Sequence, residues 1–341
     1  MRKMLLRAFT LIAAFVALSS PLSAGFYSFT VITPPGASSS MPTGINNAGD
    51  FVGLENVISP PSTQSFRFSG GSYSTIAVPG ATRTLVSGIN GQGQYVGAYF
   101  TGPNLSAFAF MGGMYQTLTP PNVQAGTTSA VAINDVGQVL LNSIDNNVNN
   151  VNFVYKNSQY TLLTALLPAD PNNPSFAFAS GINNAATIVG AITSPSQVTD
   201  GFILQGNQVT TIDDPNASNG TLGLGTIANA INNSGQVAGY YTDANFVAHG
   251  FVYDNGAFTT VDAPLGAGGT QIFGINDSGQ LVGQFFDANG DAFGFLATPV
   301  AAVPEPSSLT MLAIAGVAVA GGRLRRRLGK APGAEPASGT N

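Results

Sequence analysis

The sequence of 341 residues contains no cysteine, a single histidine and few charged side chains, which make up 8% of it. Without cysteine the chain forms no disulfide, carries out no thiol catalysis and holds no cysteine-ligated zinc. Its stability must therefore come from packing and hydrogen bonding. The histidine, His249, is accompanied by no serine elbow, zinc signature or phosphate-binding loop.

Basic residues are scarce between the two ends of the chain. Between residues 25 and 300 there are three, Arg67, Arg83 and Lys156, against fourteen acidic residues, so the formal charge is 3 − 14 = −11. A surface of this charge repels phosphate backbones, and we therefore expect no nucleic-acid partner. The same charge favours divalent cations and cationic partners.

The first 24 residues predict a secretory signal peptide. Basic residues precede an apolar run over residues 8–18, and small residues at 22–24 provide a cleavage site. We therefore expect the chain to cross the inner membrane and the mature domain to span residues 25–300.

The C-terminal segment contains a short proline motif, an apolar run and a basic cluster, in that order. The motif lies in a linker over residues 301–308 and is followed by an apolar segment at 309–322. As a helix that segment would cover roughly 21 Å of a hydrocarbon layer of about 30 Å, so it is short for a permanent transmembrane span. The positive-inside rule places the basic tail, residues 323–341, in the cytoplasm. The motif and the cluster are formed by Pro304, Glu305, Pro306, Arg325, Arg326 and Arg327.

This order resembles the PEP-CTERM sorting signal of Gram-negative bacteria. The resemblance implies that an exosortase recognises the Pro-Glu-Pro element at the inner membrane, cuts off the tail and releases or transfers the protein to the cell surface. The extension over residues 328–341 departs from the pattern, because such signals usually stop soon after the basic cluster. An ordinary C-terminal membrane anchor is the alternative.

The mature domain contains six copies of a repeat. Each copy has an Ile-Asn pair, and five copies have glycine three residues after the asparagine, where the fourth has Ala186. An asparagine in such a turn hydrogen-bonds the backbone two residues on, so we interpret it as architectural. We expect positive φ at the glycine position and a strain of about 1 kcal/mol at Ala186. The asparagines, spaced by 44 or 49 residues, are Asn46, Asn90, Asn134, Asn183, Asn232 and Asn276.

A second landmark of each copy is a pair of aromatic or leucine residues two positions apart, such as Phe251 and Tyr253. A period of two predicts a strand with one buried face. A tight turn follows, clearest at residues 254–256, and a proline closes the next strand. Each copy thus predicts four short antiparallel strands, the size of one propeller blade.

The two ends of the mature domain predict how the blades close. The mature domain begins with the second strand of a unit, over residues 27–32, and finishes with an unpaired first strand over residues 293–298. Pairing of these two strands closes a ring without an exposed edge. The predicted fold is therefore an all-β, six-bladed β-propeller closed by its N- and C-terminal strands and flanked by the signal peptide and the sorting helix. An open β-solenoid is the alternative.

The units also resemble a bacterial extracellular repeat family named for His-Ala-Phe (HAF), whose copies pair that tripeptide with a Gly-Ile-Asn-x-x-Gly-x-x-Val-Gly element. The corresponding residues here are 249–251 and 274–283. The resemblance implies secretion but no particular activity.

His249 aligns with other residues of the repeat, which favours a structural role over that of a general base. Its counterparts in the aligned copies are Gln64, Ser106, Val151, Asp200 and Asp291.

One acidic loop is a candidate calcium site. Asp287, Asn289 and Asp291 place three oxygen-bearing side chains at alternate positions of a glycine-containing loop, but no distal bidentate glutamate follows. A plain Asn-Gly turn explains the same residues. Calcium is the only cofactor that the sequence suggests.

Two classes of function follow. The first is a non-catalytic surface or biofilm-matrix protein that associates with exopolysaccharide or the cell envelope. Loops rich in Asn, Ser, Thr and Tyr are suited to form hydrogen bonds with sugars. The second is an enzyme acting on glycans or lactones. It requires two carboxylates about 5–9.5 Å apart in a cleft, or a metal at the channel axis.

Overall fold

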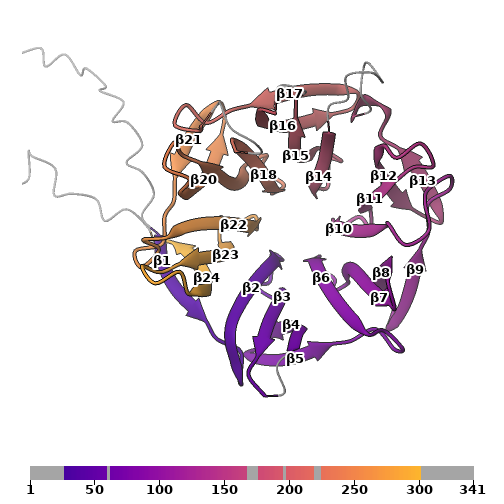
Figure 1. The fold of residues 1–341 in the computed structure, drawn as a ribbon, viewed down its shortest axis with the longest axis horizontal. Helices are drawn as coiled ribbons and strands as arrows, with labels where there is room; N and C mark the ends of the chain where they lie inside the picture. The colour runs from indigo at the N-terminus through magenta and orange to yellow at the C-terminus, as the bar shows by residue number, and fades with distance from the viewer. Residues whose placement is uncertain (1–26, 60–61, 167–175, 195–196, 219–223, 301–341) are drawn as a thin grey trace, which may run out of the picture. The chain divides into compact units, whose positions relative to one another are not determined.

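The computed structural model describes residues 27–59, 62–166, 176–194, 197–218 and 224–300. Tyr27–Val300 forms one compact unit. Its strands form six four-stranded antiparallel sheets arranged as blades around a central axis (Figure 1). Two cavities, described below, lie in the channel along this axis. The predicted six-bladed β-propeller is thus confirmed, and the open solenoid is wrong.

The first three blades follow the chain in order, each from its innermost to its outermost strand. The first contains β2 (Ala37–Ile45), β3 (Phe51–Val57), β4 (Ser62–Ser69) and β5 (Ser72–Ile76). The second contains β6 (Arg83–Ile89), β7 (Tyr95–Thr101), β8 (Asn104–Met111) and β9 (Met114–Leu118). The third contains β10 (Ser129–Ile133), β11 (Val139–Ile144), β12 (Asn150–Lys156) and β13 (Gln159–Leu162).

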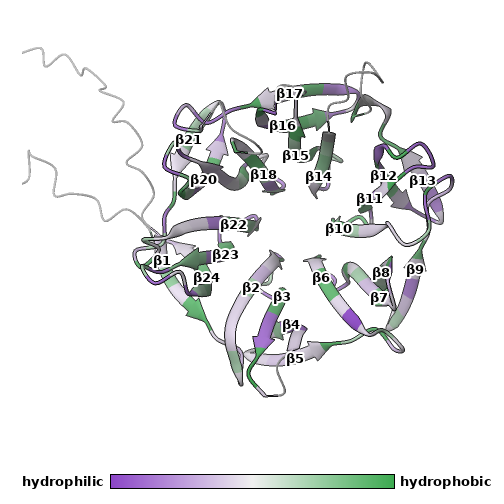
Figure 2. Cartoon of the chain, viewed as in Figure 1, coloured by the Kyte–Doolittle hydropathy of each residue, from purple (hydrophilic) through white to green (hydrophobic). Residues whose placement is uncertain are grey.

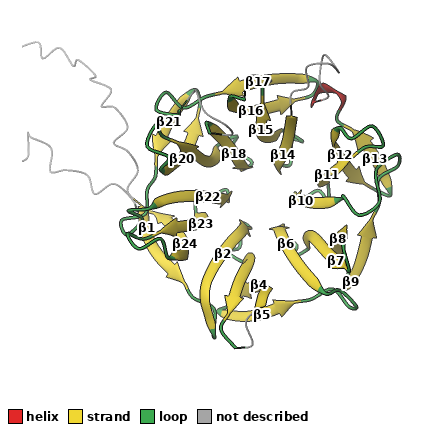
Figure 3. Cartoon of the chain, in the orientation of Figure 1, coloured by secondary structure: helices red, strands yellow, loops and turns green. Residues whose placement is uncertain are grey.

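The remaining blades continue around the ring. The fourth follows the short 3-10 helix η1 (Thr164–Leu166) and contains β14 (Phe176–Ile182), β15 (Ile188–Thr193), β16 (Thr199–Gln205) and β17 (Gln208–Ile212). The fifth contains β18 (Thr226–Ile231), β19 (Val237–Thr242), β20 (Ala248–Asp254) and β21 (Ala257–Thr260). The sixth contains β22 (Gly269–Ile275), β23 (Leu281–Phe286), β24 (Ala292–Pro299) and β1 (Tyr27–Ile32). Figure 3 shows that loops join these strands and that η1 is the helical element in the described part of the chain.

The sixth blade closes the ring. β1 pairs with β24 in antiparallel register, from Tyr27 opposite Pro299 to Ile32 opposite Gly294. The rings of Phe29 and Phe295 lie 5.3 Å apart across this pair. The two ends of the compact unit therefore share one sheet, as the sequence predicted.

A buried phenylalanine and a glycine opposite it organise the inside of most blades. In the second blade Gly97 pairs with Phe108, and a Cβ on Gly97 would collide with the backbone oxygen of Leu85. Phe108 is fully buried, as is its counterpart in four other blades, and burying such a side chain contributes about 1.5–3 kcal/mol. Hydrophobic residues accordingly concentrate on middle strands such as β15 and β23 (Figure 2). The buried phenylalanines of this set are Phe66, Phe108, Phe202, Phe251 and Phe295.

This pairing corrects the alignment of the sixth copy. Phe251 pairs with Gly239, and the equivalent pair in the sixth blade is Phe295 with Gly283. The position of His249 is therefore occupied there by Phe293, and the alignment with Asp291 was wrong. The sequence pattern predicted the wrong register for this copy, because Phe293 and Phe295 are both aromatic and fit the period-two pattern in either register.

The predicted targeting segments lie outside the described residues. These are the signal peptide at 1–24, the linker at 301–308, the apolar segment at 309–322 and the basic tail at 323–341. In the part of the chain that the structure describes, no helix is long and apolar enough to cross a membrane.

Candidate functional site

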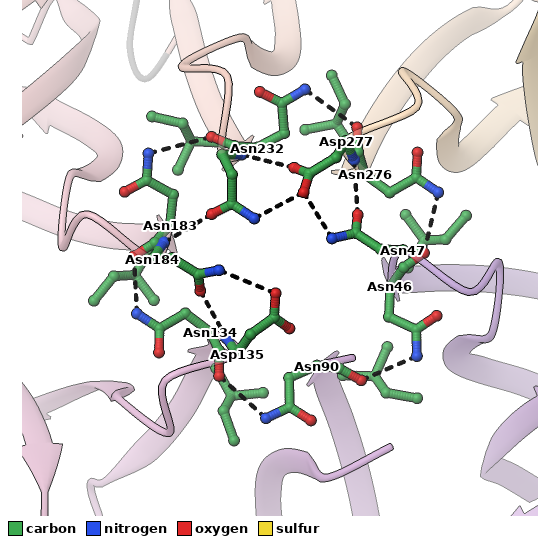
Figure 4. A pocket seen from close by; sticks show the side chains of 17 residues that line it. Asn46, Asn47, Asn90, Asn134, Asp135, Asn183, Asn184, Asn232, Asn276 and Asp277 are labelled. Carbon is green, nitrogen blue, oxygen red and sulfur yellow. Dashed lines mark hydrogen bonds between the residues drawn. The ribbon is translucent and has the colours of Figure 1, made fainter. Parts of the chain in front are cut away.

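The six repeat asparagines form a closed ring of hydrogen bonds around one end of the channel (Figure 4). All six are buried. Within its own turn, the Oδ1 atom of Asn46 accepts the backbone N–H groups of Ala48 at 3.0 Å and Asp50 at 2.9 Å. Its Nδ2 atom donates to the backbone oxygen of Asn90 in the next blade at 3.0 Å. Each asparagine therefore stabilises its own turn and one junction between blades.

The same interblade bond recurs at all six junctions, including the one between the last blade and the first. The bonds from Nδ2 to the next backbone oxygen are Asn46 to Asn90 (3.0 Å), Asn90 to Asn134 (3.1 Å), Asn134 to Asn183 (2.8 Å), Asn183 to Asn232 (3.2 Å), Asn232 to Asn276 (3.1 Å) and Asn276 to Asn46 (3.0 Å). The sequence predicted the turns but not this ring.

The backbone conformation of the turns agrees with the sequence prediction. The residue three positions after each asparagine has positive φ, for example 80° at Gly49 and 75° at Gly137. Ala186, which replaces glycine in the fourth blade, has a φ of 59°. This left-handed conformation costs a residue with a Cβ atom roughly 1 kcal/mol.

We expect Ala186→Gly to leave stability unchanged or raise it by up to about 1 kcal/mol, because relief of the strain is partly offset by the flexibility of glycine in the unfolded chain. The reverse change, Gly137→Ala, introduces the same strain in the third blade and should lower stability by about 1 kcal/mol. Urea denaturation of the two variants measures both effects. A clear loss of stability in Ala186→Gly would contradict this description of the turn.

A second polar ring lies next to the first, and five of its six members line the same cavity of about 70 Å³. Each member follows one repeat asparagine directly. The backbone N–H of Asn233, for example, donates to Asp277 Oδ1 at 2.8 Å, and that of Asp277 donates to Asn47 Oδ1 at 2.8 Å. Gly91 has no side chain with which to complete the sixth link. The ring comprises Asn47, Asp135, Asn184, Asn233 and Asp277, which line the cavity, and Gly91, which joins it through its backbone bond to Asp135.

Both carboxylates of this ring serve as hydrogen-bond acceptors. Asp135 accepts the backbone N–H of Gly91 at 2.7 Å and the side-chain amide of Asn184 at 3.1 Å. Burial raises the pKa of Asp277, but the hydrogen bonds from Asn233 and Asn47 outweigh it and hold the pKa below its ordinary value. The lowered pKa keeps Asp277 a charged acceptor. The two carboxylates belong to the third and the sixth blades, which lie opposite each other around the ring.

A layer of isoleucines separates the asparagine ring from the rest of the channel. The same six side chains, all buried, line both the asparagine cavity and a second cavity of about 90 Å³. The wall of the second cavity includes small residues such as Gly181 and Ala230, where a Cβ on Gly181 would lie 2.9 Å from Ala230 Cα. The innermost strands thus approach closely. The isoleucines are Ile45, Ile89, Ile133, Ile182, Ile231 and Ile275.

His249 lies between two carboxylates. Its Nδ1 atom is 2.8 Å from Asp262 Oδ2, and its Nε2 atom is 3.8 Å from Asp243 Oδ2. Its ring stacks on Tyr241 with centroids 5.2 Å apart. Hydrogen bonds from the backbone of Val247 and from Asn245, together with the charge of His249, lower the pKa of Asp243. Sequence reasoning missed both acidic partners, which reach His249 from a hairpin turn and from the end of the next strand.

The calcium candidate is a self-contained turn. Asp287 Oδ1 accepts the backbone N–H groups of Asn289 at 2.8 Å and Asp291 at 3.0 Å. The equivalent turns that begin at Asp145 and Asp243 have the same bonds. Within the described ranges no group of three or more acidic or histidine side chains is arranged to hold a metal ion. The calcium site stays a hypothesis beside the plain turn.

We expect the melting temperature to be the same in millimolar calcium and in chelator, because the turn already satisfies the oxygens of Asp287. Differential scanning fluorimetry makes the comparison. A rise in calcium that disappears in Asp287→Asn would instead establish a calcium site, since a ligand bound only by the folded state stabilises it.

Comparison with known proteins matches residues 302–327 to the PEP-CTERM protein-sorting motif. The chain is thereby indicated to be secreted and sorted by an exosortase-type enzyme at the membrane, as in Gram-negative bacteria. No curated protein matches the chain significantly. The resemblance to HAF repeats stays a prediction.

Several solved structures resemble this chain. The Aleuria aurantia lectin, a six-bladed β-propeller with fucose recognition, is 9% identical over 76% of this chain and 91% of that chain, with a TM-score of 0.47. A mutant of AofleA from Arthrobotrys oligospora is 14% identical over 79% and 86%, with a TM-score of 0.46. TolB from Acinetobacter baumannii is 10% identical over 78% and 65%, with a TM-score of 0.41.

Proposed function

We propose that this protein is a non-catalytic binding or structural propeller of the cell surface or biofilm matrix, associated with exopolysaccharide or the cell envelope. The observation that carries the proposal is the sorting motif at residues 302–327, which follows directly on a closed propeller. The polar rings support a non-catalytic role for the channel, because their asparagines are used in hydrogen bonds that hold the blades together.

A co-sedimentation assay with the exopolysaccharide of the producing bacterium tests this proposal. Purified residues 25–300, which contain the whole compact unit, should co-sediment with the insoluble polymer and release no reducing ends from it. Failure to bind either the polymer or isolated envelope would overturn the proposal.

A glycan- or lactone-acting enzyme is the alternative, and one observation favours it. The contact of 2.8 Å between His249 and Asp262 is of the kind that orients a general base. If reducing ends or shortened chains accumulate in the same assay, and His249→Ala abolishes them, the enzyme is correct and the non-catalytic proposal is wrong.

The sorting motif makes a separate prediction. Replacement of Pro304, Glu305 and Pro306 by alanine should leave the propeller folded and retain the uncut precursor in the inner membrane, because the processing enzyme no longer recognises it. Cell fractionation and immunoblotting measure the precursor and the surface form. Glu335→Ala, outside the matched residues, is the control and should be sorted normally. Normal surface display of the triple variant would refute the sorting role of this motif.

A further inference from the structure

A pocket of about 430 Å³ lies between the third and the fourth blades, which are neighbours in the ring (Figure 1). One wall comes from β12 and β13 of the third blade, and the other comes from β15, β16 and two turns of the fourth blade. The described residues that line it include no acid, although the domain as a whole is strongly acidic. Sites for small molecules have volumes of about 300–1,000 Å³, so this pocket is large enough for such a ligand.

The strand register shows that the two walls face the same space. Leu140 of the third blade and Leu204 of the fourth belong to one buried cluster, against which Val154 packs. Val154 pairs with Leu140, so both point toward the fourth blade. Lys156 and Gln159 are a facing pair two positions further along the same strands, and they therefore point to the same side.

The pocket exists because the fourth blade lacks the aromatic residues that fill the equivalent space elsewhere. Between the second and the third blades, Tyr155 stands in the place of Leu204, and its hydroxyl accepts from Gln116 Nε2 of the second blade at 2.9 Å. Strand pairing defines three such positions, and each of the other five blades has at least one aromatic residue among them. In the fourth blade all three are aliphatic, namely Ile188, Leu204 and Val209. Departures from a stabilising pattern are expected at functional sites.

Two hydrogen-bond donors of the third blade lie at this pocket without an acceptor. Gln138 Oε1 accepts from Asn134 Nδ2 at 2.7 Å, and within the described residues Gln138 Nε2 makes no hydrogen bond. Lys156 is the only lysine between residues 25 and 300. It is exposed and makes no ion pair in the same part of the chain.

The equivalent residues of other blades show which partner is missing. In the fifth blade Gln236 Nε2 donates to Asp254 Oδ2 at 3.2 Å, and Asp254 stands in the place of Lys156. In the sixth blade Gln280 Nε2 is 3.4 Å from Oγ1 of the equivalent residue, Thr298. A lysine at this place donates but cannot accept. An anionic acceptor supplied by a ligand would satisfy the amide and the ammonium group together.

We propose that this pocket binds a uronic acid unit of an acidic glycan, whose carboxylate accepts from Lys156 and Gln138. The C–H face of the sugar ring contacts the aliphatic wall at Leu204, and its hydroxyl groups bond to the exposed amides of Gln159 and Asn207. A sugar fits this lining better than a fatty acid does, because a fatty acid would leave those amides unused. The proposal rests on the proposed function and specifies the class of glycan and the place where it binds.

Titration with methyl glycosides tests the site. Methyl glycosides of glucuronic, galacturonic and mannuronic acid, each beside its neutral counterpart, are titrated into purified residues 25–300 and followed by ligand-observed NMR. The ionic strength is about 0.15 M, at which charges more than about 8 Å apart are largely screened, so the distant acids of the domain contribute little. At least one uronide should bind, and its neutral counterpart should bind at least about tenfold more weakly, because a charged hydrogen bond is lost.

Removal of the ammonium group tests the role of Lys156. Lys156→Gln should weaken uronide binding at least about tenfold and leave the binding of the neutral glycosides unchanged. Arg83→Gln is the matched control, because it makes the same change in net charge at an exposed residue of β6 outside the pocket. This control should bind as the wild type does.

A second variant tests the space rather than the charge. Leu204→Phe installs the ring that Phe68 and Phe110 provide in the first and second blades. It should fill the pocket and abolish uronide binding, while the melting temperature stays equal or rises. If this variant fails to fold, Lys156→Gln decides alone.

The outcomes distinguish the pocket from the proposed function. If the wild type binds the producer's exopolysaccharide but no uronide, or if Lys156→Gln binds uronides as the wild type does, the pocket assignment is wrong and the proposed function stands. Absence of wild-type binding to uronides, polymer and isolated envelope would overturn both. Binding of decanoate that is lost in Lys156→Gln, without uronide binding, would overturn the sugar assignment.

Discussion

Deletion of residues 25–32 should prevent the propeller from folding stably. The deletion removes β1, and with it the antiparallel ladder to β24, the buried Ile32 and the contact of Phe29 with Phe295. The buried Ile32 at about 1.5–3 kcal/mol, the partly buried Phe29 at about half of that and several hydrogen bonds of about 1 kcal/mol each add up to roughly 5 kcal/mol. Typical stabilities are about 5–15 kcal/mol, so a loss of this size removes much or all of the folded state.

Thermal unfolding followed by circular dichroism measures the effect. The matched control is deletion of residues 301–341, which lie outside the compact unit and should shift the melting temperature by less than about 2 °C. If the variant without β1 melts within about 2 °C of the full mature domain, pairing of β1 with β24 contributes little to stability, and the account of ring closure is wrong.

Asn90→Ala should destabilise the domain by about 3 kcal/mol, because it leaves several buried polar groups unpaired at about 1–3 kcal/mol each. The Asn90 side chain accepts the backbone N–H groups of Gln92 and Gln94 and donates to the backbone oxygen of Asn134. The change therefore weakens one turn and one blade junction together. Urea denaturation gives the difference in the free energy of unfolding.

Asn47→Ala provides the comparison, since Asn47 belongs to the neighbouring ring but is exposed. Its loss should cost less than about 1 kcal/mol because water replaces the missing bonds. A double variant of Asn90 and Asn134 should be non-additive, as these residues share a hydrogen bond. Equal destabilisation by Asn47→Ala and Asn90→Ala would mean that the buried ring has no special structural role.

The features that could be predicted from the sequence are those determined within one repeat or by its ends. The Ile-Asn spacing, the period-two aromatic pairs and the complementary strands at the two ends led to the prediction of six blades and of their closure. The left-handed conformation of Ala186 could be predicted because its position in the turn is defined by residues four or fewer positions away.

The features that could not be predicted depend on contacts between blades. Nothing in the pattern around Asn90 shows that its amide reaches Asn134, 44 residues away. The acidic partners of His249 come from Asp243 and Asp262, which meet only once the hairpins form.

Ring closure is the central claim, and the absence of cysteine allows a direct test. Ser28 and Thr298 face each other across β1 and β24. Facing residues of an antiparallel pair have Cα atoms about 4.5–5.5 Å apart, within the range that a disulfide spans. The Ser28→Cys/Thr298→Cys double variant of residues 25–300 should therefore oxidise to an intramolecular disulfide, seen as faster migration on non-reducing gels and a higher melting temperature. A folded monomer whose two thiols both remain free under the same oxidation would contradict the closed propeller.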